Sequence, residues 1–171
     1  QTQGTPLDYS RLKRETEISF PTLKKLLFAL EAIFIIRSVA VEGSRKGHVI
    51  FFEDQGEANW LRSLSPSLEE NLIHFCFTHI RAQFEYRSGH KTEIFQYRTR
   101  GGAFIPIGFR NRDGVLGILP LEDITNLKRA IGSANSFLKT YLNSKVLILH
   151  PGADRRLLQS RLLVAPMAEF V

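Results

Sequence analysis

The sequence predicts a mixed α/β protein in which an N-terminal winged helix-turn-helix, residues 1–62, precedes a layered α/β domain, residues 63–171. Three observations lead to this prediction. Two short amphipathic helical patterns lie side by side near the N-terminus, and two β-branched segments joined by a basic turn follow them. The rest of the chain alternates helical and strand-like segments in the order α-β-β-β-α-β, which is typical of sheets covered by helices.

The two N-terminal helices have recognisable start signals. Asp8 is placed to cap a short helix over residues 9–16, and Ser19 is a suitable N-cap for a second helix whose first turn accommodates Pro21. Two helices separated by a tight turn are typical of a helix-turn-helix. Apolar residues recur at three- and four-residue spacing in the second helix and predict one buried face, made of Leu23, Leu26, Leu27, Leu30 and Ile33.

A hairpin with a basic tip follows these helices. Residues 34–43 and 48–54 are rich in β-branched and aromatic residues, and "SRKG" between them is a turn. Helix, turn, helix and hairpin together predict a winged helix. The alternative is a small helical bundle that carries a hairpin.

The second half begins with a long helix. Ser67 followed by Glu70 predicts a capping box at the start of a helix over residues 65–84. Thr125 is expected to cap a later amphipathic helix over residues 126–142. Strands are expected over residues 93–99, 103–109, 115–121 and 145–150, the last of them interior, with a final strand or extended piece over 161–171.

Two prolines interrupt these predicted strands. Pro106 lies in the middle of "AFIPIGF" and Pro120 near the end of "VLGILPL". Proline has no N–H for a sheet ladder, so within sheets it occurs at edges, first positions and bulges. We therefore expect both prolines at bulges or at a margin of the sheet.

Composition and charge restrict the functional classes. A net charge of +6 and a pI near 9.7 favour an acidic partner, most commonly nucleic acid. The apolar runs are shorter than the roughly 20 residues of a membrane span, no signal segment is present, and the single Cys76 cannot form an internal disulfide. We therefore expect a cytoplasmic protein without a membrane partner. His74, Cys76 and His79 crowd one helix without a second cluster, so neither a metal nor another cofactor is expected.

The order of these parts resembles a known arrangement. The stretches "LDYSRLKRETEISFPTLKKLLFALEAIFIIR", "HVIFFEDQGEANWL", "LEENLIHFCFTHIR", "YRTRGGAFI" and "LLVAPMAEF" cover most of the chain. In this order they are similar to the C-terminal region of predicted bacterial and archaeal AAA+ superfamily ATPases, a winged helix followed by a restriction-endonuclease-like domain of unknown function. The resemblance implies either the C-terminal part of such an ATPase, with the ATPase domain ahead of Gln1, or a stand-alone descendant of one. This chain itself has no phosphate-binding loop, so by itself it is not expected to bind ATP.

The resemblance also implies a degenerate active site. Active members of the endonuclease class hold a divalent metal with a helix Glu, a strand Asp and a Glu-x-Lys on the next strand. Here Pro106 occupies the position expected for the Asp, and the next strand reads Leu-Gly-Ile-Leu-Pro up to Pro120. Only Glu70 matches an acidic position, and its capping role accounts for it. We therefore expect no catalytic residue and no enzymatic activity.

Nucleic-acid binding is the function that this reading favours. The candidate DNA-binding residues lie on the second helix and on the hairpin tip, where they would meet backbone phosphates: Thr22, Lys24, Lys25, Arg45, Lys46 and His48. The alternative is a protein-interaction or oligomerisation module that couples the upstream ATPase domain to a partner. The sequence leaves both open, together with the oligomeric state.

Overall fold

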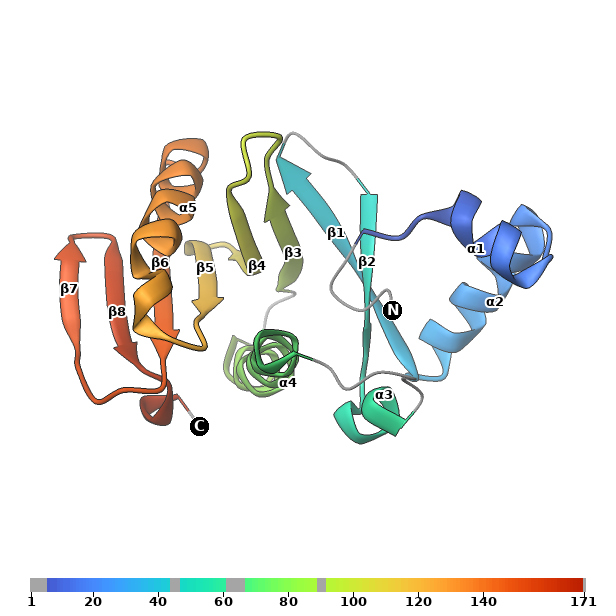
Figure 1. The fold of residues 1–171 in the computed structure, drawn as a ribbon, viewed down its shortest axis with the longest axis horizontal. Coiled ribbons are helices and arrows are strands. Elements are labelled where there is room, and N and C mark those ends of the chain that lie inside the picture. The colour runs from blue at the N-terminus through green and yellow to red at the C-terminus, as the bar shows by residue number, and fades with distance from the viewer. Residues whose placement is uncertain (1–5, 44–46, 61–66, 89–91, 171) are drawn as a thin grey trace.

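The computed structural model describes residues 6–43, 47–60, 67–88 and 92–170 of the chain. Within these ranges the protein is a mixed α/β structure with one eight-stranded sheet in the order β2-β1-β3-β4-β5-β6-β8-β7 (Figure 1). The strands are Ile36–Gly43 (β1), Gly47–Phe52 (β2), Glu93–Arg98 (β3), Phe104–Asn111 (β4), Gly114–Pro120 (β5), Ser144–His150 (β6), Arg156–Gln159 (β7) and Leu162–Pro166 (β8). The helices are Tyr9–Thr16 (α1), Phe20–Ala32 (α2), Gln55–Trp60 (α3), Leu68–Ser88 (α4) and Leu127–Thr140 (α5), with short 3-10 turns at Ile124–Asn126 (η1) and Met167–Glu169 (η2).

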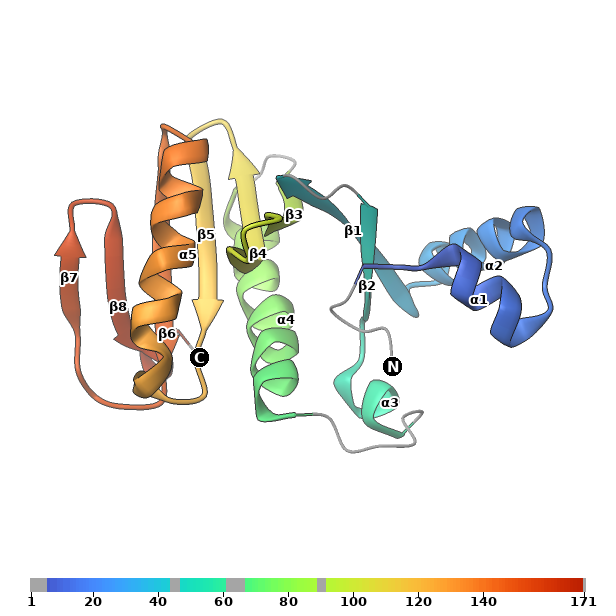
Figure 2. The ribbon, with the colours of Figure 1, turned by 45° about the horizontal axis from the view of Figure 1, so that its top comes forward.

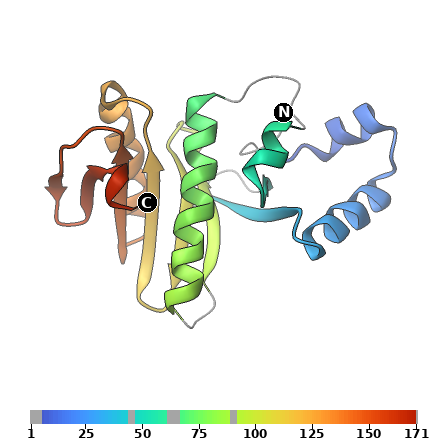
Figure 3. The ribbon, with the colours of Figure 1, turned by 90° about the horizontal axis from the view of Figure 1, so that it is seen from below.

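Helices α4 and α5 cover opposite faces of the sheet (Figure 3). On one face Phe77 of α4 packs in a cluster with Phe109 of β4. On the other face Phe137 of α5 packs in a second cluster with Phe95 of β3. Strand β6 contributes buried residues to both clusters and pairs in parallel with β5 and β8, which confirms the prediction of an interior strand.

Helices α1 and α2 begin where the sequence predicts. The Asp8 carboxylate accepts hydrogen bonds from two backbone N–H groups at the start of α1, at 2.9 and 3.0 Å. The Ser19 hydroxyl accepts one from the Thr22 N–H at 3.4 Å. Both predicted N-caps are confirmed. The two helices project together from the β1–β2 end of the sheet (Figure 2).

The apolar face predicted for α2 is only partly covered. Leu23 is buried and Leu27 and Leu30 are half-buried, but Leu26 and Ile33 are 45% and 64% exposed. The expectation of a single buried face was therefore wrong. Helical spacing predicts the direction of an apolar face, whereas the burial of that face depends on the breadth of the surface beneath it. Here α2 rests on the β1 side of one hairpin, which is too narrow to cover the whole face.

The N-terminal hairpin belongs to the same sheet as the second half of the chain. Strands β1 and β2 pair antiparallel, as expected of the predicted hairpin. On its other side β1 pairs in parallel with β3, so that Ala40 lies opposite Phe95. The sheet thus runs across the boundary predicted at residues 62 and 63, and the division into two domains stays a prediction.

The second half has the predicted order of α4, β3, β4, β5, α5 and β6. Thr125 was wrongly predicted to cap α5. Instead the Asp123 carboxylate accepts a hydrogen bond from the Thr125 N–H at 3.1 Å and starts η1, from which α5 continues. An Asp side chain reaches an N–H two residues ahead readily, which explains why it caps this turn. Two short elements, α3 and β7, were not predicted, because each has too few residues to show a period.

No helix within the described ranges is both long and apolar enough to cross a membrane. The cytoplasmic location stays a prediction.

Candidate functional sites

Pro106 is the extra residue of a β-bulge in β4. The pairing register shifts by one residue between Phe95 and Tyr97 of β3. As a result, Gln96 alone stands opposite both Pro106 and Ile107. The extra residue of a bulge is not paired in the ladder, so a residue without an N–H fits there. The prediction for Pro106 is confirmed.

The bulge also changes the face that the β4 side chains reach. Ile105, before the bulge, packs in the cluster beneath α5, whereas Ile107, after it, packs in the cluster beneath α4. In a regular strand residues two apart share a face. The bulge therefore places Ile105 and Ile107, which are two residues apart, in the cores on opposite faces of the sheet.

Pro120 ends β5 where that strand separates from β4. The β4–β5 ladder reaches only as far as the pair of Ile107 and Ile118. The next residue, Leu121, donates its N–H to the Leu149 carbonyl of β6 at 2.8 Å. Because neighbouring N–H groups of a strand point in opposite directions, an N–H at Pro120 would point towards β4, where the ladder has ended. Pro120 thus lies at a margin of the paired region, as predicted.

A cavity of about 170 Å³ opens where the two strands separate, and we call it the fork cavity. The Glu122 carboxylate, directly after β5, accepts a hydrogen bond from the Glu69 N–H and so ties this loop to the first turn of α4. The Ser133 hydroxyl accepts one from the Phe104 N–H at 3.1 Å. The lining consists of Glu69, Phe104, Leu119, Pro120, Leu121, Glu122, Asn126, Arg129, Ala130 and Ser133.

The fork cavity does not bring together the helix Glu, the strand Asp and the Glu-x-Lys that the resemblance implies for an active member. Glu70 is turned back on its own helix: its carboxylate accepts the Ser67 N–H at 3.2 Å, and its N–H donates to the Ser67 hydroxyl at 3.1 Å, which confirms the capping box. Pro106 and Pro120 offer no ligand. Across the described ranges, no group of three or more His, Cys, Asp and Glu is placed to hold a metal ion. Catalytic silence itself stays a prediction.

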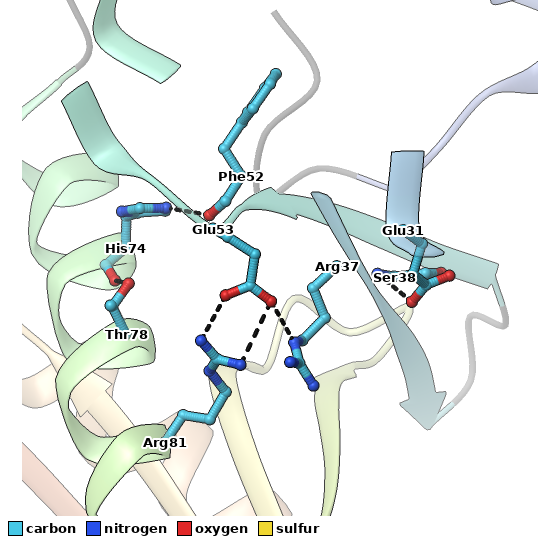
Figure 4. A network of polar contacts seen from close by, with 8 residues as sticks. All are labelled: Glu31, Arg37, Ser38, Phe52, Glu53, His74, Thr78 and Arg81. Atoms are coloured by element: carbon cyan, nitrogen blue, oxygen red, sulfur yellow. Dashed lines mark hydrogen bonds and ion pairs between the residues drawn. The ribbon is translucent and has the colours of Figure 1, made fainter. Parts of the chain in front are cut away.

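A polar network joins the N-terminal hairpin to α4 (Figure 4). The Glu53 carboxylate, just after β2, pairs with Arg81 of α4 at 2.5 Å and with Arg37 of β1 at 2.7 Å. Beside it the His74 Nε2–H donates to the Phe52 carbonyl at 2.6 Å. The Glu53 side chain is only 17% exposed, and the two guanidinium groups compensate its negative charge. The network fixes α4 against the hairpin.

A second network joins β1, β4 and α5 near the C-terminal ends of these three elements. Arg110 donates to both carboxylate oxygens of Glu42, at 3.0 and 2.7 Å, and Tyr141 donates its hydroxyl at 2.5 Å. Burial opposes the ionisation of Glu42, but the hydrogen bonds from Arg110 and Tyr141 outweigh it and hold the pKa of Glu42 below its usual value. The Arg110 guanidinium also lies 4.7 Å from the centre of the Phe95 ring. Glu42 is thus a structural carboxylate.

The candidate DNA-binding residues of α2 are exposed. Thr22, Lys24 and Lys25 lie in the first two turns of the helix. The Lys24 ammonium stands 4.6 Å from the centre of the Phe20 ring, and the Thr22 hydroxyl is 2.8 Å from that of Ser19. Their exposure agrees with contact to a partner but does not select nucleic acid.

The hairpin contributes less to this candidate surface. Arg45 and Lys46 lie outside the described residues. His48 is exposed, with its Nδ1 3.2 Å from the Ser38 hydroxyl. Of the predicted DNA-binding set, the structure therefore describes the three residues of α2 and this histidine.

Large apolar side chains dominate the rest of the surface of α2 and its C-terminal end. The helix ends at Ala32, and Phe34, two residues later, has a left-handed φ of 59°, so that the chain turns into β1. The exposed fractions are 42% for Phe20, 45% for Leu26, 74% for Phe28, 64% for Ile33 and 72% for Phe34. Sequence reasoning missed this surface because it assigned Leu26 and Ile33 to a buried face by their helical spacing and gave Phe20, Phe28 and Phe34 no role.

Comparison with known proteins identifies no relative: no family model, no curated protein and no solved structure matches this chain. The class of the protein is therefore defined by its own fold, a mixed α/β structure with a single eight-stranded sheet in its described part. Function has to be inferred from the surfaces described above.

Proposed function

We propose that this chain is a non-catalytic interaction module that pairs with a second copy of itself through α2. The observation that carries the proposal is the exposure of the five large apolar side chains on α2 and its C-terminal end. If each side chain of this size presents about 200 Å² when fully exposed, the five expose roughly 600 Å². Leu26 and Ile33, the two of the five that lie on the pairing stripe described below, supply roughly 220 Å² of this. A stable interface buries about 800 Å² on each partner, so we expect a weak, reversible dimer.

The pattern on α2 suits an antiparallel partner helix. Thr22, Leu26, Ala29 and Ile33 are all exposed and follow one another at spacings of four, three and four residues, which places them in one stripe along the helix. About a two-fold axis near the middle of this stripe, Leu26 would face the small Ala29 of the other copy. A large side chain opposite a small one lets two helices approach closely, and the same contact is made twice.

The lysines of α2 bear on the choice between a second copy of the chain and nucleic acid as the partner. Lys25 is exposed beside the stripe, whereas Lys24 is exposed on the other side of the helix, over the Phe20 ring. An interface with double-stranded DNA is polar and strongly basic, so large exposed phenylalanines are unexpected in it. In a paired α2 the lysines would repel one another weakly, and added salt would screen that repulsion.

The test is the oligomeric state of the purified chain. Sedimentation velocity over a wide concentration range should show a monomer–dimer equilibrium that does not weaken at higher salt. Changing Leu26 and Ile33 together to Lys should weaken it by about a hundredfold or more, because each buried aliphatic side chain contributes about 1.5 kcal/mol or more. The matched control is Leu142→Lys, since Leu142 is 84% exposed and lies in the turn before β6, away from α2.

The outcome that competes with self-pairing is that the chain binds DNA. A labelled duplex titrated with the protein would then show an affinity that falls steeply with salt, by a slope of about −0.9 per neutralised phosphate, and that is lost when Lys24 and Lys25 become Glu. A monomer at every concentration overturns the proposal. If that monomer binds DNA in this way, the nucleic-acid prediction replaces it.

The absence of catalysis is part of the same proposal. What supports it is the replacement of the expected Asp by Pro106 and the capping geometry of Glu70. Incubation with DNA and Mg²⁺ or Mn²⁺ should give no cleavage. Cleavage that a chelator and Glu70→Ala both abolish would contradict it. The resemblance to the C-terminal region of AAA+ ATPases stays a prediction.

A further inference from the structure

A groove lies on the α4 face of the sheet, between that helix and the C-terminal end of the chain. Two adjoining cavities of about 370 Å³ each form it, and they share Leu116, Lys145 and Arg161. Figure 3 looks onto this face, with α4 in front and the C-terminal end to one side. We call this feature the β6 groove, because Lys145 of β6 belongs to both cavities.

The strand period explains why the floor of the β6 groove is apolar. Leu147 of β6 belongs to the core cluster beneath α4, and Leu163 of β8 packs against that cluster, so both side chains are on this face. Lys145 precedes Leu147 by two residues and therefore shares its face. Leu157 of the edge strand β7 pairs with Leu163 and is 70% exposed. Phe170 closes one side of the groove.

Two cations, Lys145 and Arg161, line both cavities of this apolar surface. The Lys145 side chain is exposed, and Arg161 in the β7–β8 turn donates to the Leu142 carbonyl at 2.6 Å. Within the described residues neither of the two forms an ion pair with a carboxylate. The one acidic residue of the lining, Asp113, belongs to the cavity on the β4–β5 turn side and not to the cavity closed by Phe170.

We propose that the β6 groove binds an anionic amphiphile, with its head group at Lys145 and Arg161 and its apolar chain over Leu147, Leu163 and Phe170. Ligand sites are mostly apolar cavities of about 300–1,000 Å³ with a few convergent polar groups, and the cavity closed by Phe170 has this composition. At about 30 Å³ for each water-sized group, 370 Å³ accommodates roughly twelve heavy atoms. A ten-carbon carboxylate has that size. The inference is independent of pairing through α2.

Decanoate below its micelle concentration is the probe. Titration followed by amide chemical shifts should be saturable with one site, and the perturbed amides should cluster on β6, β8 and the C-terminal segment. Decylammonium has the same chain and the opposite charge, so it should bind at least about fivefold more weakly. Lys145→Met keeps the apolar stem of the side chain and should weaken decanoate binding by about threefold to tenfold.

The matched control is Lys139→Met, which removes an exposed lysine from α5 on the opposite face of the sheet. It should leave decanoate affinity unchanged. Equal binding of decanoate and decylammonium, perturbed amides centred on α2, or no saturable binding would each overturn the proposal. The comparison of the two ligands uses the unaltered protein, so it decides the matter even if a variant fails to fold.

Discussion

Deletion of Pro106 should leave the protein folded, although this residue lies in the middle of a buried strand. A one-residue deletion in a regular strand moves the side chains on one side of it to the opposite face. Here the bulge already contains the extra residue. When Pro106 is removed, Ile105 and Ile107 become neighbours, and neighbours in a regular strand point to opposite faces, as these two already do.

The expected cost follows from what is lost. Deletion removes one buried proline ring and leaves every other β4 side chain on its present face, so we expect about 1–2 kcal/mol of destabilisation. For a chain of this size that lowers the melting temperature by about 2–8 °C. The matched control is deletion of Gly117, which lies in regular pairing with Gly108 and Val146 and has no side chain of its own.

Deletion of Gly117 should prevent folding. It would turn the neighbouring β5 side chains to the wrong face, among them Ile118 and Leu119, which are 0% and 8% exposed. Each misplaced side chain costs about 1.5–3 kcal/mol, and the total approaches the whole stability of a typical domain. Thermal unfolding followed by circular dichroism compares the two deletions. If the protein without Pro106 is as unfolded as the protein without Gly117, our assignment of the bulge is refuted.

Two further predictions concern titratable side chains. The pKa of Glu42 is lowered in the folded state, so ionised Glu42 stabilises the protein above its unfolded pKa, and this contribution disappears as the pH falls through the folded pKa. Glu42→Gln should therefore destabilise the protein at pH 7 but much less at pH 3. Urea unfolding at both pH values measures the difference. Burial raises the pKa of the Cys76 thiol to about 12, so iodoacetamide at pH 8 should modify this thiol only after unfolding. Mass spectrometry measures the modification. Rapid modification of the native protein would contradict the burial of Cys76.

Local signals in the sequence were the most reliable. The N-caps at Asp8 and Ser19 and the capping box of Ser67 and Glu70 are interactions within four residues, so the chain specifies them without tertiary help. The bulge at Pro106 was also predictable, because proline excludes the regular alternative.

Long-range features were not accessible in the same way. The fork cavity depends on Glu122 reaching the first turn of α4, which is more than fifty residues away along the chain. The exposure of Leu26 and Ile33 depends on where the sheet ends beneath α2. The parallel pairing of β1 with β3 also joins segments that no local pattern connects. Each requires the tertiary structure, which periodicity alone does not contain.

The parallel pairing of β1 with β3 also has a consequence during synthesis on the ribosome. Strand β1 ends at Gly43 and β3 begins at Glu93, so the hairpin emerges well before the strand that completes it. At about 5–20 residues per second, the roughly fifty intervening residues delay that strand by several seconds. During this time the β1 edge has unpaired N–H and C=O groups and can pair with another nascent chain on the same polysome. Slower translation over residues 44–92 would lengthen this exposure and lower the yield of native protein.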